Sequence, residues 1–168
     1  HLEVETGANR TGLIEASFKK TLTFIKKNKE HFSFEGLCTH FGGAESLSNE
    51  FKVSKQFKRF QWYYKECKIK NFLPKLRHMA SSAATFMYPE SHYEMVRVGV
   101  AQYGFWPSPD VYYWYQAQHG KNGGKLKRIF TWKTDIMDVR GVQPGEFIGY
   151  GTAFQATREM RIAVLPLG

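Results

Sequence analysis

The chain begins with the run His1-Leu2-Glu3-Val4-Glu5-Thr6-Gly7-Ala8-Asn9-Arg10. The first residues alternate, with Leu2 and Val4 on one face and charged or polar residues on the other, which is the pattern of a β-strand with one buried face. Gly7 ends this alternation, and polar residues follow as far as Arg10. The run therefore predicts a strand that leads into a polar loop.

Strand-like and helix-like segments then alternate along the first part of the chain. The predicted order is a strand over residues 1–5, a helix marked by Ile14, Phe18, Leu22 and Ile25, a strand over 34–41, a helix marked by Val53, Phe57, Phe60, Tyr64 and Cys67, a strand over 72–79, a short helix over 80–87, and a strand over 93–100. A repeat of about 30 residues is typical of βα units around a parallel sheet. Four such units form half of a (β/α)8 barrel, and a small doubly wound sheet is the alternative.

The pattern changes after Pro107, where antiparallel strands replace the repeat. We predict a glycine- and lysine-rich loop over 120–125, strands over 126–139, 147–154 and 161–167, and a turn over 143–146. Proline presets φ and glycine accepts positive φ, which favours this turn. The predicted domains are half of a barrel over residues 1–118 and the start of an antiparallel β domain over 119–168.

The composition narrows the class of protein. The chain has 168 residues, of which 42% are hydrophobic, and a net charge of +9. We find no apolar run of about 18 residues that could span a membrane and no signal peptide. The lysines fall mostly on predicted helix faces, so we do not expect nucleic-acid binding. Cys38 and Cys67 lack metal-ligand spacing, so we expect no metal and two thiols that stay reduced in the cytoplasm.

Candidate site residues follow the predicted strands, because active sites of α/β barrels lie at the carboxyl ends of their strands. Arg10, His40 and Arg97 lie at three of these ends. Ser82, with the backbone of residues 99 and 100, fits the usual phosphate site of such barrels.

Each of these residues also has a structural interpretation. His40 could bond a backbone carbonyl, and Arg10 and Arg97 could form ion pairs with Glu3 and Glu5. The residue at position 82 could simply cap a helix, and Gly99 could be present for packing. The pattern alone therefore predicts only a half-barrel that binds phosphate.

Six short motifs of the chain occur in the same order as in one known protein family. Residues 1–12 resemble HLKxDTGMxRxG of the alanine racemases, 36–41 resemble GxxTHF, 78–84 resemble HxANSAA, 95–104 resemble MVRPGIxxYG, 142–151 resemble xxxGexvgYG, and 161–168 resemble RIAvvPiG. Together they cover nearly the whole chain. The resemblance implies the second half of a pyridoxal-phosphate-binding TIM barrel followed by the start of the β domain.

The resemblance also implies a function for the longer parent protein. This is the interconversion of L- and D-alanine by a two-base mechanism, which supplies D-alanine for peptidoglycan in the bacterial cytoplasm. The alternatives are a non-catalytic barrel protein that carries pyridoxal phosphate, and a racemase or decarboxylase of the same fold for another amino acid. The parent would be a homodimer, and its Schiff-base lysine would lie upstream. We therefore expect this chain to be an internal fragment that is inactive alone and self-associates through its open sheet edges.

The resemblance assigns roles to the candidate residues. Arg10 would bond the phenolic oxygen of the cofactor, and Arg97 would face its pyridine nitrogen. Tyr150 would be a catalytic base supplied by the other subunit, with His40 between it and Arg97. The phosphate would be held by Ser82 and by the backbone of Gly99 and Val100.

The clearest departure from the family pattern is Glu3, which replaces a lysine that is often carbamylated. We hypothesise that the carboxylate of Glu3, with Glu5 nearby, supplies the negative charge that supports Arg10.

Overall fold

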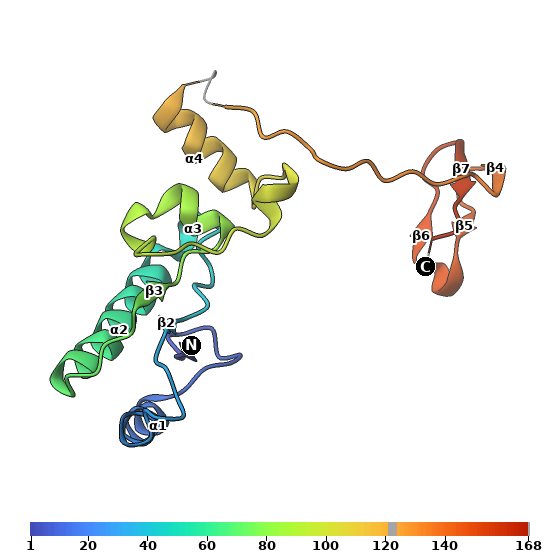
Figure 1. Cartoon of the computed structure of the whole chain (residues 1–168). Coiled ribbons are helices and arrows are strands. Elements are labelled where there is room, and N and C mark those ends of the chain that lie inside the picture. The colour runs from blue at the N-terminus through green and yellow to red at the C-terminus, as the bar shows by residue number, and fades with distance from the viewer. Residues whose placement is uncertain (121–123, 168) are drawn as a thin grey trace. The chain divides into compact units, whose positions relative to one another are not determined.

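The computed structural model describes residues 1–120 and 124–167. The chain divides into two compact units, His1–Ile129 and Phe130–Gly168 (Figure 1), and each is described by itself. Residues 121–123 of the predicted 120–125 loop, and Gly168, lie outside the described residues. The domain boundary at 118/119 remains a prediction.

A three-stranded parallel sheet organises the first unit. The strands are β1 (Leu2–Glu3), β2 (Gly36–Cys38) and β3 (Leu76–His78), in the order β1-β2-β3. Leu2 pairs with Leu37, which pairs with Arg77. This arrangement confirms the parallel sheet predicted from the repeat.

Helices connect and follow these strands. They are α1 (Glu15–Lys27), α2 (Glu50–Ile69), α3 (Ser82–Met87) and α4 (Pro109–His119), with 3-10 turns η1 (Leu47–Asn49), η2 (Pro89–Ser91) and η3 (Val100–Tyr103). In α1, Glu15 lies in the first turn and Lys26 and Lys27 in the last, which suits the helix dipole. No helix was predicted from the sequence over the residues of α4. Its start is marked by Ser108, whose side chain accepts a hydrogen bond from the Val111 N–H (3.2 Å), and by Pro109 in the first turn.

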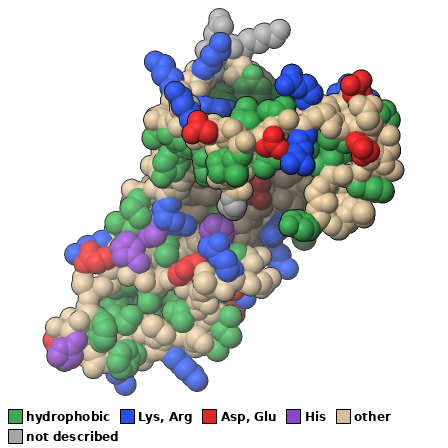
Figure 2. All heavy atoms as spheres, turned by 90° about the vertical axis from the view of Figure 1, so that its right-hand side faces the viewer, with side chains coloured by type: hydrophobic (Ala, Val, Ile, Leu, Met, Phe, Trp, Pro, Cys, Tyr) green, Lys and Arg blue, Asp and Glu red, His purple; other side chains and the backbone are tan. Residues whose placement is uncertain are grey.

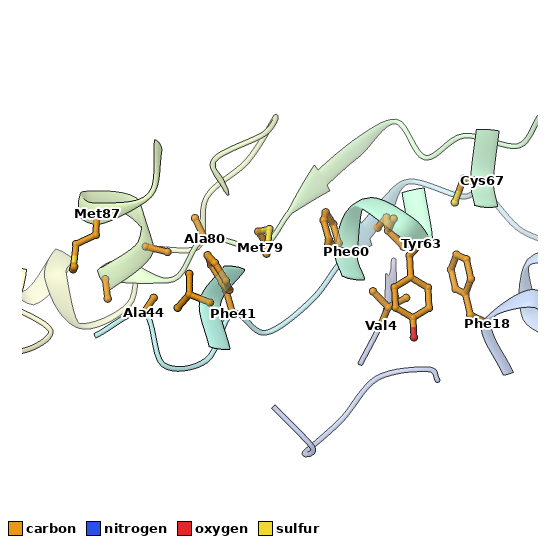
Figure 3. Packing of buried hydrophobic residues seen from close by; sticks show 14 of the residues in the cluster. Val4, Phe18, Phe41, Ala44, Phe60, Tyr63, Cys67, Met79, Ala80 and Met87 are labelled. Atoms are coloured by element: carbon orange, nitrogen blue, oxygen red, sulfur yellow. The ribbon is translucent and has the colours of Figure 1, made fainter. Parts of the chain in front are cut away.

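The apolar faces of α1 and α2 pack against the sheet to form one continuous core. Figure 3 shows this core running from Phe18 and Tyr63 through Phe60 to Phe41 and Met87. The rings of Phe18 and Tyr63 meet edge to face, with centroids 4.9 Å apart. The Tyr63 hydroxyl lies 3.2 Å from two backbone carbonyls, those of Glu5 and Leu13, so α2 is tied to the loop after β1.

The predicted fourth strand over 93–100 is wrong. Within the described residues, this segment has no strand ladder to β3. It is joined to the residues that follow β3 by one backbone–backbone hydrogen bond, from the Arg97 N–H to the Ala80 carbonyl (3.0 Å). The carboxylate of Glu94 accepts the Arg77 N–H at 2.7 Å. It therefore occupies a donor that a paired strand would need.

The second unit is built from two antiparallel pairs. Strands β4 (Asp138–Val142) and β7 (Met160–Val164) pair, as do β5 (Phe147–Ile148) and β6 (Phe154–Gln155). The turn predicted over 143–146 is confirmed, because the Glu146 N–H donates to the Gln143 carbonyl (3.2 Å).

Two strand predictions in this region fail. Most of the segment over 126–139 is exposed and is not a strand, and strand structure begins only at Asp138, where β7 lies opposite. The segment over 147–154 is a hairpin rather than one strand. Gly149 (φ +78°) and Gly151 (φ +66°) bend it through the 3-10 turn η4 (Tyr150–Thr152), a backbone shape that other residues adopt at a cost.

The surface bears on the expected partners. In Figure 2, Lys and Arg side chains form several separate groups with Asp and Glu among them. None of the helices in the described part of the chain combines the length and apolar character needed to cross a membrane.

Cys38 and Cys67 are both free thiols, and burial raises the pKa of Cys67 to about 12.

Candidate functional site

A pocket of about 490 Å³ lies beyond the carboxyl ends of β2 and β3. The predicted site residues that line it are His40, Ser82, Arg97, Gly99 and Val100. Glu45 and Pro107, which sequence analysis did not single out, also line it. Residues from three separate segments thus meet at one rim of the parallel strands.

Arg97 links the ends of two strands. Its guanidinium donates to the Thr39 carbonyl at 2.8 Å and to the His78 carbonyl at 3.0 Å. A third bond goes to Nδ1 of His78. None of these partners is a carboxylate, so the alternative in which Arg97 pairs with Glu3 or Glu5 is wrong.

His78 is a neutral partner of Arg97 that the sequence analysis missed as a site residue. Burial, and then the positive charge of Arg97, lower the pKa of His78 to about 4. Because a guanidinium can only donate, Nδ1 of His78 accepts and its ring proton lies on Nε2, which donates to Nδ1 of His1 at 2.8 Å. The motif containing His78 was visible in the sequence, but its contact with Arg97 was not.

Ser82 lies in the pocket wall beside Gly99. Its buried Oγ accepts hydrogen bonds from the N–H of Gly99 at 2.8 Å and of Ala101 at 3.4 Å. The Val100 backbone continues the same wall. Because Oγ accepts in both of these bonds, the Ser82 hydroxyl can still donate its own hydrogen to an anion in the pocket.

His40 lies half-buried in the pocket and is not tied to a backbone carbonyl by any bond within the described residues. Burial lowers its pKa, and the charges of Arg10 and Arg97 lower it further. Arg10 is exposed and lies outside the lining of the pocket, but its charge reaches His40.

The two acidic residues assigned to Arg10 have other partners. Glu3 accepts a hydrogen bond from the Thr11 hydroxyl at 2.8 Å, and buried Glu5 accepts one from the Gly7 N–H. Neither carboxylate forms an ion pair with Arg10. Their support of Arg10 therefore stays a proposal about electrostatic field rather than contact.

Tyr150 belongs to the second unit, so its position is described only there. It lies in η4 and its side chain is fully exposed, at 101%. The glycines on both sides of Tyr150 have positive φ, so the chain turns there, and the phenol is exposed to solvent.

The loop after β2 forms another wall of the pocket, and side chains from α2 and α4 hold it. Asp110 accepts hydrogen bonds from the Ser46 hydroxyl (2.9 Å) and the Leu47 N–H (3.1 Å). Gln56 bonds both backbone groups of Gly42. Neither Asp110 nor Gln56 was predicted from the sequence to be a site residue. The Ser-Pro-Asp start of α4 was a readable helix signal, whereas a buried glutamine has no signature of its own.

A pocket with these donors at the carboxyl ends of parallel strands is the arrangement of the active sites of α/β-barrel enzymes. The fold and the pocket therefore place the chain in this class of protein.

Comparison with known proteins narrows the class. Residues 1–107 match the family model for the alanine racemase N-terminal domain, and residues 129–168 match that for the alanine racemase C-terminal domain. The chain belongs to the alanine racemase family. The predicted fold is confirmed: the second half of a TIM barrel followed by the start of a β domain.

Individual relatives agree with the family models. The chain is 33% identical to alanine racemase 1 of Clostridium acetobutylicum, over 100% of this chain and 41% of the relative. It is 32% identical to the alanine racemase of Geobacillus stearothermophilus, over 100% of this chain and 40% of the relative.

Solved structures give the same result. The structure of alanine racemase from Streptomyces coelicolor matches with a TM-score of 0.72 at 25% identity, over 99% of this chain and 42% of that one. That from Bacillus anthracis with bound L-Ala-P matches with a TM-score of 0.70 at 27% identity, over 100% and 42%. The chain spans about two fifths of the length of these relatives.

Proposed function

We propose that this chain is part of a pyridoxal-phosphate-dependent racemase that interconverts L- and D-alanine. One observation carries the proposal: Arg97, His40 and Ser82 line a single pocket at the ends of parallel strands, although Arg97 and His40 lie 57 positions apart along the chain. The alternative of a non-catalytic carrier is disfavoured because such carriers lack a β domain, and the second unit matches one.

The residues present fit the cofactor. The pocket of about 490 Å³ lies within the usual range for small-molecule sites, about 300–1,000 Å³. The Ser82 hydroxyl and the backbone of Gly99 and Val100 would hold the phosphate, with the Gly99 N–H exchanging Ser82 Oγ for a phosphate oxygen, and Arg10 would bond the phenolic oxygen. When bound, the cofactor withdraws electrons from the substrate Cα and so makes its proton removable.

Arg97 would face the pyridine nitrogen. Arginine keeps its protons because the pKa of its side chain exceeds about 12, so it donates a hydrogen bond without transferring a proton. The two carbonyls of Thr39 and His78 hold the guanidinium in place. Neutral His78 adds an acceptor without adding a second positive charge. By donating a hydrogen bond while keeping its proton, Arg97 would leave this nitrogen unprotonated, which would limit side reactions.

Racemisation requires a proton to leave one face of Cα and return to the other, so two bases must face each other. We assign one base to the Tyr150 that the partner subunit of a homodimer would supply. We assign the other base to a lysine of the parent protein that lies upstream of this chain. A tyrosine with its ordinary pKa of about 10 is a poor base near neutrality. In this proposal His40 would lie between Arg97 and the Tyr150 of the other subunit, and it would connect this base to a positive charge.

Several finer points belong to the same proposal. The substrate is alanine, the product D-alanine serves peptidoglycan synthesis, and the enzyme is cytoplasmic. Residues 1–118 form the barrel part and 119–168 the start of the β domain. Glu3 and Glu5 place negative charge near Arg10 without touching it.

The full-length parent, loaded with pyridoxal phosphate, tests the proposal. Starting from L-alanine, chiral chromatography should show D-alanine rising until the two enantiomers are equal. Arg97→Lys should lower the rate strongly, because a lysine cannot keep the planar set of three bonds. Arg158→Lys, on an exposed residue of the second unit, is the matched control. A loaded parent that forms no D-alanine would overturn the assignment.

A further inference from the structure

Gln56 is a buried polar side chain that the proposed mechanism does not use. It lies in the middle of α2, only 1% of its surface is exposed, and its carboxamide is fully bonded. Its Oε1 accepts the Gly42 N–H at 3.1 Å, and its Nε2 donates to the Gly42 carbonyl at 2.7 Å and to the Lys52 carbonyl at 3.3 Å. A glutamine that binds both polar groups of one peptide residue fixes the orientation of that residue.

The residue that Gln56 binds lies directly beside a proposed catalytic group. Gly42 lines the pocket two positions after His40, and a Cβ added to Gly42 would lie 3.9 Å from Cδ2 of the His40 ring. Glycine has more backbone freedom than other residues, and here it is followed by Gly43. The order of this wall must therefore come from neighbouring side chains.

The same side chain also contacts the loop after β1. Gly7 has φ +145°, and a Cβ added there would lie 3.0 Å from Cγ of Gln56. The Cβ added to Gly42 would also lie 3.9 Å from Cβ of Ala8 in this loop. Gln56 thus lies between the two strand-end loops that carry Arg10 and His40.

We propose that Gln56 is a positioning residue, which fixes the Gly42 peptide and through it holds the His40 ring in the pocket. Asn49 assists by donating to the Gly43 carbonyl at 3.1 Å. The consequence for catalysis rests on the proposed racemase function, whereas the positioning itself does not.

The test uses Gln56→Met in the full-length parent loaded with pyridoxal phosphate. Methionine keeps the length of the side chain but loses both bonds to Gly42. The matched control is Gln61→Met, the same change on the same helix at an exposed position. Gln56→Glu is a second variant, which retains the acceptor for the Gly42 N–H but lacks the amide donor.

Two measurements separate positioning from general stability. Amide hydrogen exchange should accelerate in residues 40–43 of Gln56→Met, less so in Gln56→Glu, and not in the rest of the first unit or in Gln61→Met. The kcat for racemisation should fall by about 10²-fold with KM and bound cofactor per chain unchanged, since a displacement of about 1 Å has this effect. A purely structural role would lower bound cofactor together with kcat.

The outcomes are distinct. Unchanged exchange in residues 40–43 overturns the positioning role. Faster exchange with unchanged kcat overturns the link to His40. If the wild-type parent forms no D-alanine, the proposed function fails, and the exchange data still decide whether Gln56 holds the loop. If Gln56→Met does not fold, Gln56→Glu decides by the same two measurements.

Discussion

Acidification should destabilise the protein through His78. Burial and the charge of Arg97 lower the pKa of His78 to about 4 in the folded state, whereas a histidine in an unfolded chain has a pKa of about 6.5. As the pH falls, the unfolded chain therefore takes up the proton first. The stability contribution of neutral His78 is complete above about pH 6.5 and is lost progressively between about pH 6.5 and 4.

The size of the effect follows from these two values. At pH 5 the unfolded ring is almost fully protonated and the folded ring is about one-tenth protonated, which corresponds to about 2 kcal/mol of lost stability. His78 is only 5% exposed, so solvent screening reduces this figure little. A protonated ring would also lose Nδ1 as the acceptor for Arg97.

The assay is equilibrium unfolding in urea at pH 7.5 and pH 5.0 for the wild type and His78→Asn. Asparagine keeps an acceptor for Arg97 but does not titrate. The difference in unfolding free energy between the two pH values should shrink by about 2 kcal/mol in the variant. His31→Asn is the control, because the His31 side chain is 74% exposed. Equal pH differences in His78→Asn and the wild type would refute the reasoning, as would an NMR titration of the His78 ring with a midpoint near 6.5.

Three further predictions follow from single contacts. Ser82→Ala leaves the Gly99 N–H without its acceptor and removes a proposed phosphate ligand. Pyridoxal phosphate should therefore bind about 10- to 100-fold more weakly in a fluorescence titration, and unchanged affinity would count against the phosphate role. Gly104→Ala places a Cβ 2.2 Å from the Lys127 carbonyl oxygen at a residue with φ +84°, so the midpoint of thermal unfolding should fall. The backbone conformation alone should lower the free energy of unfolding by about 1–2 kcal/mol. An unchanged midpoint would show that residues 124–129 do not pack against Gly104 in solution. Glu3→Gln keeps an acceptor for the Thr11 hydroxyl but removes the negative charge. If this charge supports Arg10, the racemisation rate of the full-length parent should fall about tenfold. Unchanged activity would exclude that support.

Local pattern was sufficient for the parts of the fold that depend on neighbours in sequence. The alternation of Leu2 and Val4, the periodicity of the two long helices and the Pro-Gly turn before Glu146 are reproduced in β1, α1, α2 and the turn of the second unit. Strand-end residues were also found from sequence, because barrel geometry places function at that edge of the sheet. His40, Ser82 and Arg97 accordingly meet in one pocket.

Strand pairing could not be predicted from local pattern, because a strand exists only where another chain segment offers its hydrogen-bonding edge. The segments over 93–100 and 126–139 have strand-like composition, yet most of their length is not strand. In the first, Glu94 accepts the Arg77 N–H of β3 that a fourth strand would need, and most of the second forms no strand ladder.

The sequence by itself determined the order of the first βα units, the family and five of the residues that line the pocket, His40, Ser82, Arg97, Gly99 and Val100. Only the tertiary structure decided which groups hold those residues: His78 and His1 behind Arg97, and Gln56 beneath the loop of His40. The physical reason is that these contacts join residues far apart in the chain, and burial then makes each hydrogen bond obligatory. A buried histidine or glutamine looks like any other in sequence until its partners are known.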